Sequence, residues 1–426
     1  MPEFRPTRAL GRAILFTGVV VLAAMLLRRP DLIVLAAPIA VGTAVSAIRR
    51  PRLGPVLEMS TAEPFVVEGN ELAATVAVGN PDPVGYDLAL VRLELPPWIS
   101  LRHGDRPYAT AVAPGTLSDI PLEGHVLRWG RHRIGPVAAV GVAGDGLFVT
   151  DPVRVRGLSV KAYPATEHFD AADTMPRAAG LVGGHRSRRP GDQGELAGVR
   201  RFAWGDRLRR IDWRISLRTR ELHVVATLSD RDAEVVLLLD VLHEAGRSGG
   251  IGGAASVLDT TVRAAAAIAE HYLHRGDRVS FLQYGFQMRR LRAASGRRHY
   301  LTGLEWLLDV TPPAHSGEPP AFGPHLIPGN ALVVVLTPLL DPRSVDMLAN
   351  LTRAGRFVVA VDTLTDPAAP VPGLGRWGTA AQALWLLERQ NLVGQLREHG
   401  VPIVTWAGAG SLDEVLRDVA RQAVSR

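Results

Sequence analysis

The chain of 426 residues contains no cysteine. This absence excludes disulfide bonds, thiolate zinc sites, iron–sulfur clusters and cysteine nucleophiles. It leaves the cellular compartment open, because a chain without cysteine suits either redox state. A hydrophobic fraction of 47% and a charged fraction of 21% are those of a folded protein, so wholesale disorder is excluded as well.

The sequence also lacks the motifs of common catalytic sites. It has neither a His-Glu-x-x-His pair for zinc nor a Gly-x-Ser-x-Gly nucleophile elbow. A glycine-rich stretch at 246–253 stands where a phosphate loop would, but without the Gly-Lys-Ser/Thr ending or the Gly-x-Gly-x-x-Gly spacing. His271 and His274 share a predicted helix face without an acidic third ligand, which indicates a solvated edge. We therefore expect a protein that is not an enzyme.

Two long uncharged runs lie near the N-terminus, at 13–27 and 32–48. Each is slightly short for a bilayer core of about 30 Å, but flanking arginines can reach the interface. The alternatives are a cleaved signal peptide and a buried core hairpin. A signal peptide is disfavoured because a second apolar run of equal length follows at once. The pattern predicts two transmembrane helices in an N-terminal segment, 1–52.

The arginines around these runs predict how the helices are oriented. Six arginines precede the first run or follow the second, namely Arg5, Arg8, Arg12, Arg49, Arg50 and Arg52. Only Arg28 and Arg29 lie in the turn between the runs. Positively charged flanks stay on the cytoplasmic side. We therefore expect a multi-pass protein of the cell membrane with its soluble domains in the cytoplasm.

Between residues 53 and 163, short β-branched runs alternate with Pro, Gly and Asn, as in YDLALVRLEL. This texture predicts a small antiparallel β-sandwich. Residues 164–232 form an arginine-rich connector. The first part of the connector, 164–197, lacks periodicity and is interpreted as a linker or mobile loop.

Strands and helices alternate from 233 to 426, which predicts a Rossmann-like, doubly wound α/β domain. Continuous apolar runs indicate strands buried on both faces. The strands are expected at Glu234–Asp240, Arg278–Tyr284, Ala331–Thr337, Arg356–Asp362 and Val401–Thr405. The helices are expected near 254–275, 298–309, 343–354, 379–398 and 411–422.

A dense motif, ELAGVRRFAWGDRLRRIDWRISLRTRELHVV, precedes the α/β domain at 195–225. It resembles the signature of the domain of unknown function 58 (DUF58) family. Two further stretches, 128–148 and 160–164, are similar to the same family. The residues that carry the motif are Arg200, Arg201, Trp204, Gly205, Asp206, Arg210, Ile211, Asp212, Trp213, Arg214, Arg218 and Leu222. The resemblance implies that 233–426 folds like a von Willebrand factor A domain.

The motif region carries a large positive charge. From Arg186 to Arg220, eleven arginines stand against four acidic residues, a surplus of 11 − 4 = 7 that exceeds the net charge of +6 of the whole chain. Three kinds of anionic group could bind these guanidinium groups: acidic side chains in internal ion pairs, anionic lipid or an acidic partner protein. In the first case Asp206 and Asp212 would fix arginines while Trp213 packs inward. Few aromatic residues interleave the arginines, so a nucleic-acid platform is not expected.

Von Willebrand A domains often hold Mg²⁺ at an Asp-x-Ser-x-Ser loop after the first strand. In this chain the aspartate is Asp240, but Leu242 and Glu244 replace the two serines. Leucine cannot bind a metal ion, and Asp341 is displaced along the chain from the position of a later ligand. Asp240, Glu244 and Asp341 are at most an irregular oxygen site. We expect no metal and no cofactor, with Asp240 capping the loop that follows it.

The resemblance also implies a class of partner. Members of the family are commonly encoded beside MoxR-type AAA+ ATPases and other A-domain membrane proteins, and are thought to act with them in assembly or maturation of protein complexes. We therefore expect a membrane-anchored scaffold that binds partner proteins through the motif residues of the arginine-rich connector and through the carboxyl edge of the sheet around Asp240–Gly253. The alternative is a metal-dependent adhesion domain that faces outward.

Overall fold

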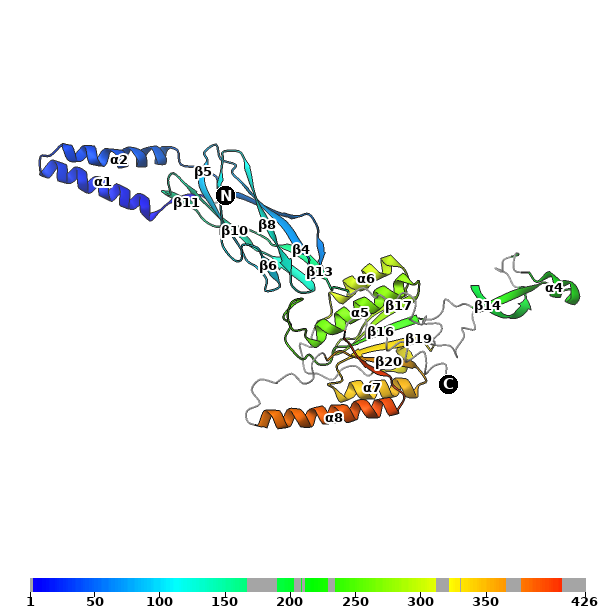
Figure 1. The fold of residues 1–426 in the computed structure, drawn as a ribbon. Helices are drawn as coiled ribbons and strands as arrows, with labels where there is room; N and C mark the ends of the chain where they lie inside the picture. The colour runs from blue at the N-terminus through cyan, green and yellow to red at the C-terminus, as the bar shows by residue number, and fades with distance from the viewer. Residues whose placement is uncertain are drawn as a thin grey trace. The chain divides into compact units, whose positions relative to one another are not determined.

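The computed structural model describes residues 3–166, 190–202, 208, 211–228, 234–311, 322–329, 331–364 and 377–407. The chain divides into two compact units, Met1–Tyr163 and Pro164–Arg426 (Figure 1). The first unit holds a helical hairpin and antiparallel sheets. The second unit holds the motif region and a mainly parallel sheet covered by helices.

The two apolar runs form two adjacent helices, α1 (Arg8–Leu26) and α2 (Asp31–Ile48). Both are long enough and apolar enough to cross a membrane. Most of their large apolar side chains are exposed, for example Leu15 at 68% and Val34 at 74%, which a buried core hairpin would not show. Helix α1 begins five residues before the predicted run, because arginine is a good helix former and Arg8 and Arg12 continue the helix.

The strands of the first unit form sheets around one core. One sheet has the order β1-β11-β10-β5-β7, with β12 also paired to β10. A second has the order β2-β4-β8-β6, and a three-stranded sheet has the order β3-β13-β9. The bounds are β1 (Phe4–Pro6), β2 (Val56–Thr61), β3 (Phe65–Val67), β4 (Glu71–Gly79), β5 (Tyr86–Leu93), β6 (Ile99–Leu101), β7 (Tyr108–Val112), β8 (Leu117–Val126), β9 (Gly130–Ile134), β10 (Val137–Ala143), β11 (Phe148–Thr150), β12 (Val153–Val155) and β13 (Leu158–Tyr163).

The predicted antiparallel β-structure at 53–163 is confirmed, with one parallel pair, β3 and β13. Alternate residues such as Leu72, Val76 and Leu122 are buried in the shared core, as the two-residue period of strands requires. Strand β1, three residues directly before α1, is not predictable from the sequence because it is too short to show a period.

Part of the predicted linker is a strand. Strand β14 (Pro190–Arg201) pairs antiparallel with β15 (His223–Leu228), and α4 (Trp213–Thr219) lies between them in the chain. The prediction of a linker or loop over 164–197 is therefore wrong from residue 190 onward. The pairing contains register shifts, so the sequence has no regular alternation to reveal it.

The sheet of the second unit has the order β18-β17-β16-β19-β20-β21. All neighbours are parallel except β18 (Arg289–Ala294), which is antiparallel to β17. The other strands are β16 (Glu234–Asp240), β17 (Arg278–Tyr284), β19 (Ala331–Thr337), β20 (Phe357–Asp362) and β21 (Ile403–Thr405). Helices α5 (Val257–His274) and α6 (Arg297–Leu307) cover one face, and α7 (Pro342–Arg353) and α8 (Gly378–Glu398) cover the other (Figure 1).

The predicted alternation of strands and helices is confirmed, and the sheet is doubly wound. Every residue of β16 and β19 is buried, as continuous apolar runs require. Helix α5 begins at a capping box in which Ser256 and Asp259 bond each other's backbone N–H groups. Strands β20 and β21 begin one and two residues later than expected. The helix expected near 411–422 lies outside the described residues.

Candidate functional site

The motif region folds around a capped helix. The Asp212 carboxylate accepts hydrogen bonds from the N–H groups of Arg214 and Ile215, both at 3.1 Å, and so caps the N-terminus of α4. The Ser216 hydroxyl accepts a bond of 2.9 Å from the His223 N–H, which ties α4 to the start of β15. Arg220 ends the helix in the left-handed region with φ of 59°.

Two features of the motif differ from the internal-pair interpretation. Trp213 is 61% exposed and does not pack inward. Among the described residues, the Asp212 carboxylate bonds the backbone N–H groups of Arg214 and Ile215 and no arginine side chain. Arg201 does pair with an acid, Glu221, at 2.8 Å.

The structure places only part of the predicted motif set. Arg201, Asp212, Trp213, Arg214 and Arg218 are described, and Arg200 is described as part of β14. Trp204, Gly205, Asp206 and Arg210 lie outside the described residues.

Helix α4 presents an apolar stripe beside a cationic one. Trp213 and Leu217 are 61% and 79% exposed and lie four residues apart, so they share a face. Arg214 and Arg218 have the same spacing and are also exposed. We call these four residues the α4 surface. Among the residues that the structure describes, neither arginine side chain has an ion-pair partner.

A second group of polar residues lies at the carboxyl edge of the parallel sheet. Asp240, Thr337 and Asp362 are the last residues of β16, β19 and β20. Parallel strands end at one edge, and the direction of winding reverses between β16 and β19. This is the topological switch point at which open α/β sheets place their sites. We call this group the carboxyl-edge cluster.

Asp240 is a buried carboxylate that neighbouring hydroxyl groups of the cluster hydrogen-bond. Its carboxylate accepts hydrogen bonds from Thr337 Oγ1 at 2.6 Å, from Ser344 Oγ at 2.5 Å and from the Leu242 N–H at 3.1 Å. The side chain is nearly inaccessible, and burial raises the pKa of Asp240 even though these bonds favour its ionised form. The predicted loop cap is present in the bond to Leu242.

The other two candidate metal ligands have different partners. Asp341 caps α7 and accepts bonds from the Arg343 N–H, Nε and Nη2 at 2.9, 2.8 and 2.6 Å. The Arg343 side chain therefore lowers the pKa of Asp341. Glu244 accepts a bond of 3.3 Å from the Leu258 N–H at the start of α5. Within the described ranges, no three His, Asp or Glu side chains gather at one position.

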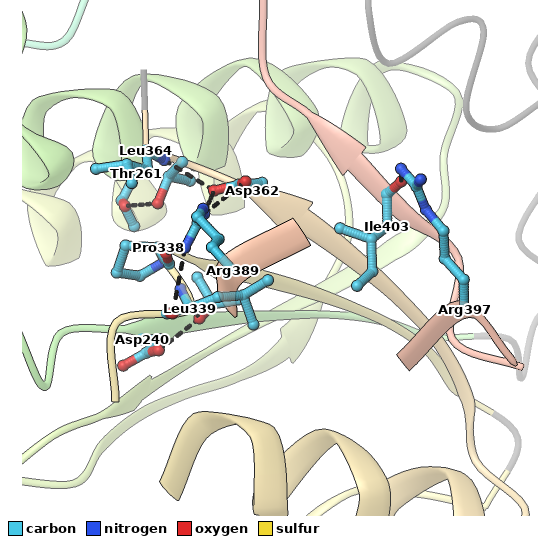
Figure 2. Close-up of polar contacts among 11 residues, drawn as sticks. Asp240, Thr261, Pro338, Leu339, Asp362, Leu364, Arg389, Arg397 and Ile403 are labelled. Atoms are coloured by element: carbon cyan, nitrogen blue, oxygen red, sulfur yellow. Dashed lines mark hydrogen bonds and ion pairs between the residues drawn. The ribbon is translucent and has the colours of Figure 1, made fainter. Parts of the chain in front are cut away.

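Arg389 of α8 is the cation of the cluster (Figure 2). Its Nη2 lies 2.7 and 2.6 Å from the two Asp362 oxygens, and its Nη1 donates to the carbonyls of Pro338 and Leu339 at 2.7 and 3.2 Å. Burial raises the pKa of Asp362, and the charge of Arg389 opposes that shift. Leu339 has a φ of 53°, so Arg389 holds carbonyls in a loop with an unusual backbone. Helix α8 is thus fastened to the ends of β19 and β20.

Sequence reasoning missed Ser344, Asp362 and Arg389. Asp362 carries the same signal as Asp240, an acid at the end of a buried apolar strand, so the reasoning applied to Asp240 would have identified it as well. Arg389 gives no such signal, because a single arginine in a helix of mixed polarity predicts a solvated position.

The segment that contains both groups matches a known family. Residues 198–380 match the family described as "Protein of unknown function DUF58". Curated relatives are the "Uncharacterized protein Rv1480" of Mycobacterium tuberculosis (strain ATCC 25618 / H37Rv) and the "Uncharacterized protein Mb1516" of Mycobacterium bovis. Each is 33% identical over 139 residues, which cover 32% of this chain and 42% of the relative. The chain therefore spans less than half the length of these relatives.

Solved structures give only slight likenesses. Native alpha-2-macroglobulin from Escherichia coli has a TM-score of 0.22 and 19% identity, covering 26% of this chain and 17% of that one. The sporulation control protein Spo0M from Bacillus subtilis has a TM-score of 0.16 and 13% identity, covering 26% and 51%. Such scores carry no argument about the fold. The segment 198–380, with α4 and the carboxyl-edge cluster, is accordingly similar to the DUF58 family.

Proposed function

We propose that this chain is a non-enzymatic, membrane-anchored accessory protein that binds a partner protein through the α4 surface. The observation that carries the proposal is the exposure of Trp213 and Leu217 beside two arginines that have no ion-pair partner among the described residues. Covering the exposed tryptophan and leucine of this seven-residue helix with another surface would remove apolar area from water, which is favourable. Trp and Arg are also the residues that most often dominate binding energy at protein interfaces.

The charge of the α4 surface specifies the chemistry of its partner. Arg214 and Arg218 add two positive charges next to the apolar stripe. A partner that covers the stripe needs carboxylates opposite these guanidinium groups, since buried arginines without acceptors cost several kcal/mol. We infer an acidic surface with an apolar centre. By family resemblance, the partner is a MoxR-type AAA+ ATPase, together with other A-domain membrane proteins.

The proposed architecture supports a scaffold. The strand order of the second unit, with one antiparallel edge strand, is consistent with the A-type fold that the resemblance implies. The proposed anchor is the α1–α2 hairpin, whose ends carry six arginines against two in the turn, which favours a cytoplasmic position for both units. The proposal assigns no metal, because Asp240, Glu244 and Asp341 each bond other protein groups.

A crosslinked pulldown of the full chain in detergent, with and without ATP, tests the proposal. The variant R214E/R218E reverses the charge of the α4 surface. The matched control, R297E/R298E, reverses two exposed arginines on α6. We expect the wild type and the control to recover an AAA+ ATPase and the α4 variant to lose it by at least about tenfold, with an unchanged melting temperature.

Two results would count against the proposal. Equal recovery by R214E/R218E and by the control would remove the α4 surface from the interface. Recovery of no ATPase, combined with ligand binding that requires Mg²⁺, would favour the outward-facing adhesion domain.

A further inference from the structure

The N-terminal end of the helical hairpin is built into the first unit. Strand β1, directly before α1, pairs with β11, with Phe4 opposite Thr150. The Phe4 side chain is fully buried in the core. Thr7 follows, and its N–H and Oγ1 donate to the carbonyls of Leu147 and Gly146 at 2.8 and 2.9 Å. No free linker therefore separates α1 from the sheets.

The other end of the hairpin is fixed just as closely. The Arg50 guanidinium donates a hydrogen bond to the Phe4 carbonyl and lies 5.5 Å from the centre of the Phe148 ring. The buried Asp82 carboxylate accepts bonds from the N–H groups of Arg52 and Leu53 at 2.7 and 2.9 Å. Burial acts to raise the pKa of Asp82, but the bonds from backbone N–H groups outweigh it and lower the pKa. The ionised carboxylate thus holds the chain where it leaves α2.

Three exposed arginines remain at this fixed end: Arg8 and Arg12 of α1, and Arg49 directly after α2. We call them the arginine collar. Among the residues that the structure describes, their side chains have no hydrogen-bond or ion-pair partner. The nearby Arg5, by contrast, pairs with Asp151 at 2.8 Å. At the opposite end, Asp31 lies 3.7 Å from Arg29 and partly neutralises the turn.

The length of the hairpin places the collar at a defined depth. Helix α1 has 19 residues, which at about 1.5 Å each span about 28 Å. The apolar core of a bilayer is about 30 Å thick, so Arg8 at the end of the helix falls at the boundary between acyl chains and headgroups. Arg12 lies four residues further in and reaches the same boundary with its long side chain. Guanidinium groups at that boundary meet lipid phosphates, which they bind with paired N–H groups.

We propose that the arginine collar binds the headgroup phosphates of anionic phospholipid and so orients the first unit on the membrane surface. The inference rests on the membrane anchoring in the proposed function, and it adds a lipid class and three named residues. Anionic lipid is favoured over zwitterionic lipid because three uncompensated charges gather at one end of the hairpin. Because both hairpin ends are hydrogen-bonded to the sheets, lipid binding at the collar restricts the orientation of the whole first unit on the membrane.

The test is retention of lipid by the purified full chain. The wild type, R8Q/R12Q/R49Q and the control R28Q/R29Q are incubated in detergent with equal amounts of phosphatidylglycerol and phosphatidylcholine. Bound lipids are then counted by native mass spectrometry. We expect the wild type and the control to retain mainly phosphatidylglycerol, and the collar variant to lose about tenfold or more of that preference.

Equal preference in the collar variant and the wild type overturns the inference, and so does an equal loss in the control. Alkaline carbonate extraction separates this outcome from a failure of the proposed anchoring. If wild-type protein leaves the membrane on extraction, the anchoring itself is wrong. If it stays and the collar variant still binds phosphatidylglycerol, only the collar is wrong. A melting curve confirms that each variant is folded.

Discussion

A single buried ion pair organises the carboxyl-edge cluster. Arg389 is 7% exposed and meets Asp362 and two carbonyls with one guanidinium group. A sequence cannot reveal this role, because nothing in the pattern of α8 distinguishes Arg389 from Arg397 of the same helix. Only the folded chain shows that one is buried and that the other donates to the Ile403 carbonyl at the surface (Figure 2).

Replacement of Arg389 by alanine should be strongly destabilising. It leaves the Asp362 carboxylate buried without its cation, and the expected loss in the free energy of unfolding is about 3 to 5 kcal/mol. Urea unfolding of the full chain measures it. The control, Arg397→Ala, should cost less than about 1.5 kcal/mol, since it removes one bond to a carbonyl. Equal losses in the two variants would show that the buried ion pair contributes no more to the free energy of unfolding than a single bond to a carbonyl.

His271 predicts a dependence of stability on pH. The sequence suggested a solvated edge, but the ring is half-buried, and burial together with Arg275 and His274 lowers its pKa from 6.5 to about 4. Between pH 6.5 and 4 the His271 imidazole is therefore protonated in the unfolded chain but neutral in the folded chain. The free energy of unfolding consequently decreases as the pH falls through this range. His271→Gln should reduce this loss in melting temperature. The exposed His274→Gln is the control, and an equal slope in wild type and His271→Gln would disprove the effect.

At the scale of elements, α4 depends on its cap. Asp212→Ala removes the acceptor for two N–H groups and should cost about 1 kcal/mol of local stability. Hydrogen exchange of the amides at 214–218 should then be faster, and partner binding weaker. Asp212→Asn keeps a capping oxygen and should behave nearly as the wild type. If both variants exchange at the wild-type rate, the cap does not hold the α4 surface in place.

The predictability of each element follows from how strongly it is buried. The strands at 234–240 and 331–337 were predicted to the residue, because burial on both faces leaves uninterrupted apolar runs. Strand β18 was missed because it lies at the sheet edge and its sequence, RRLRAA, lacks a continuous apolar run. Strand β14 was missed because its ladder is irregular. For the candidate site, Asp240 and the motif were predictable from the sequence, whereas the exposure of Trp213 was not.

At the scale of the molecule, the N-terminal strand couples the hairpin to the sheets. Phe4→Ala deletes a fully buried ring and should cost about 3 to 5 kcal/mol in unfolding of the full chain in detergent. Phe65→Ala, at a ring that is 52% exposed, is the control and should cost much less. A small effect of Phe4→Ala would mean that β1 contributes little to the core.

In the proposed function, the chain is an anchored scaffold that binds its partner through a short helix rather than through a metal or a catalytic group. Under that proposal the parts have separate tasks: the α1–α2 hairpin would fix the first unit on the membrane, and the α4 surface would recruit the partner. We expect the charge of the α4 surface to favour acidic partner surfaces.

The most direct measurement places a photo-crosslinking amino acid at Leu217 of the full chain in intact membranes, with Leu301 on α6 as the exposed control position. Mass spectrometry then identifies the adducts. The account predicts an adduct with an AAA+ ATPase from position 217 and none from position 301. The absence of that ATPase at 217, or its equal capture at both positions, would contradict the central claim.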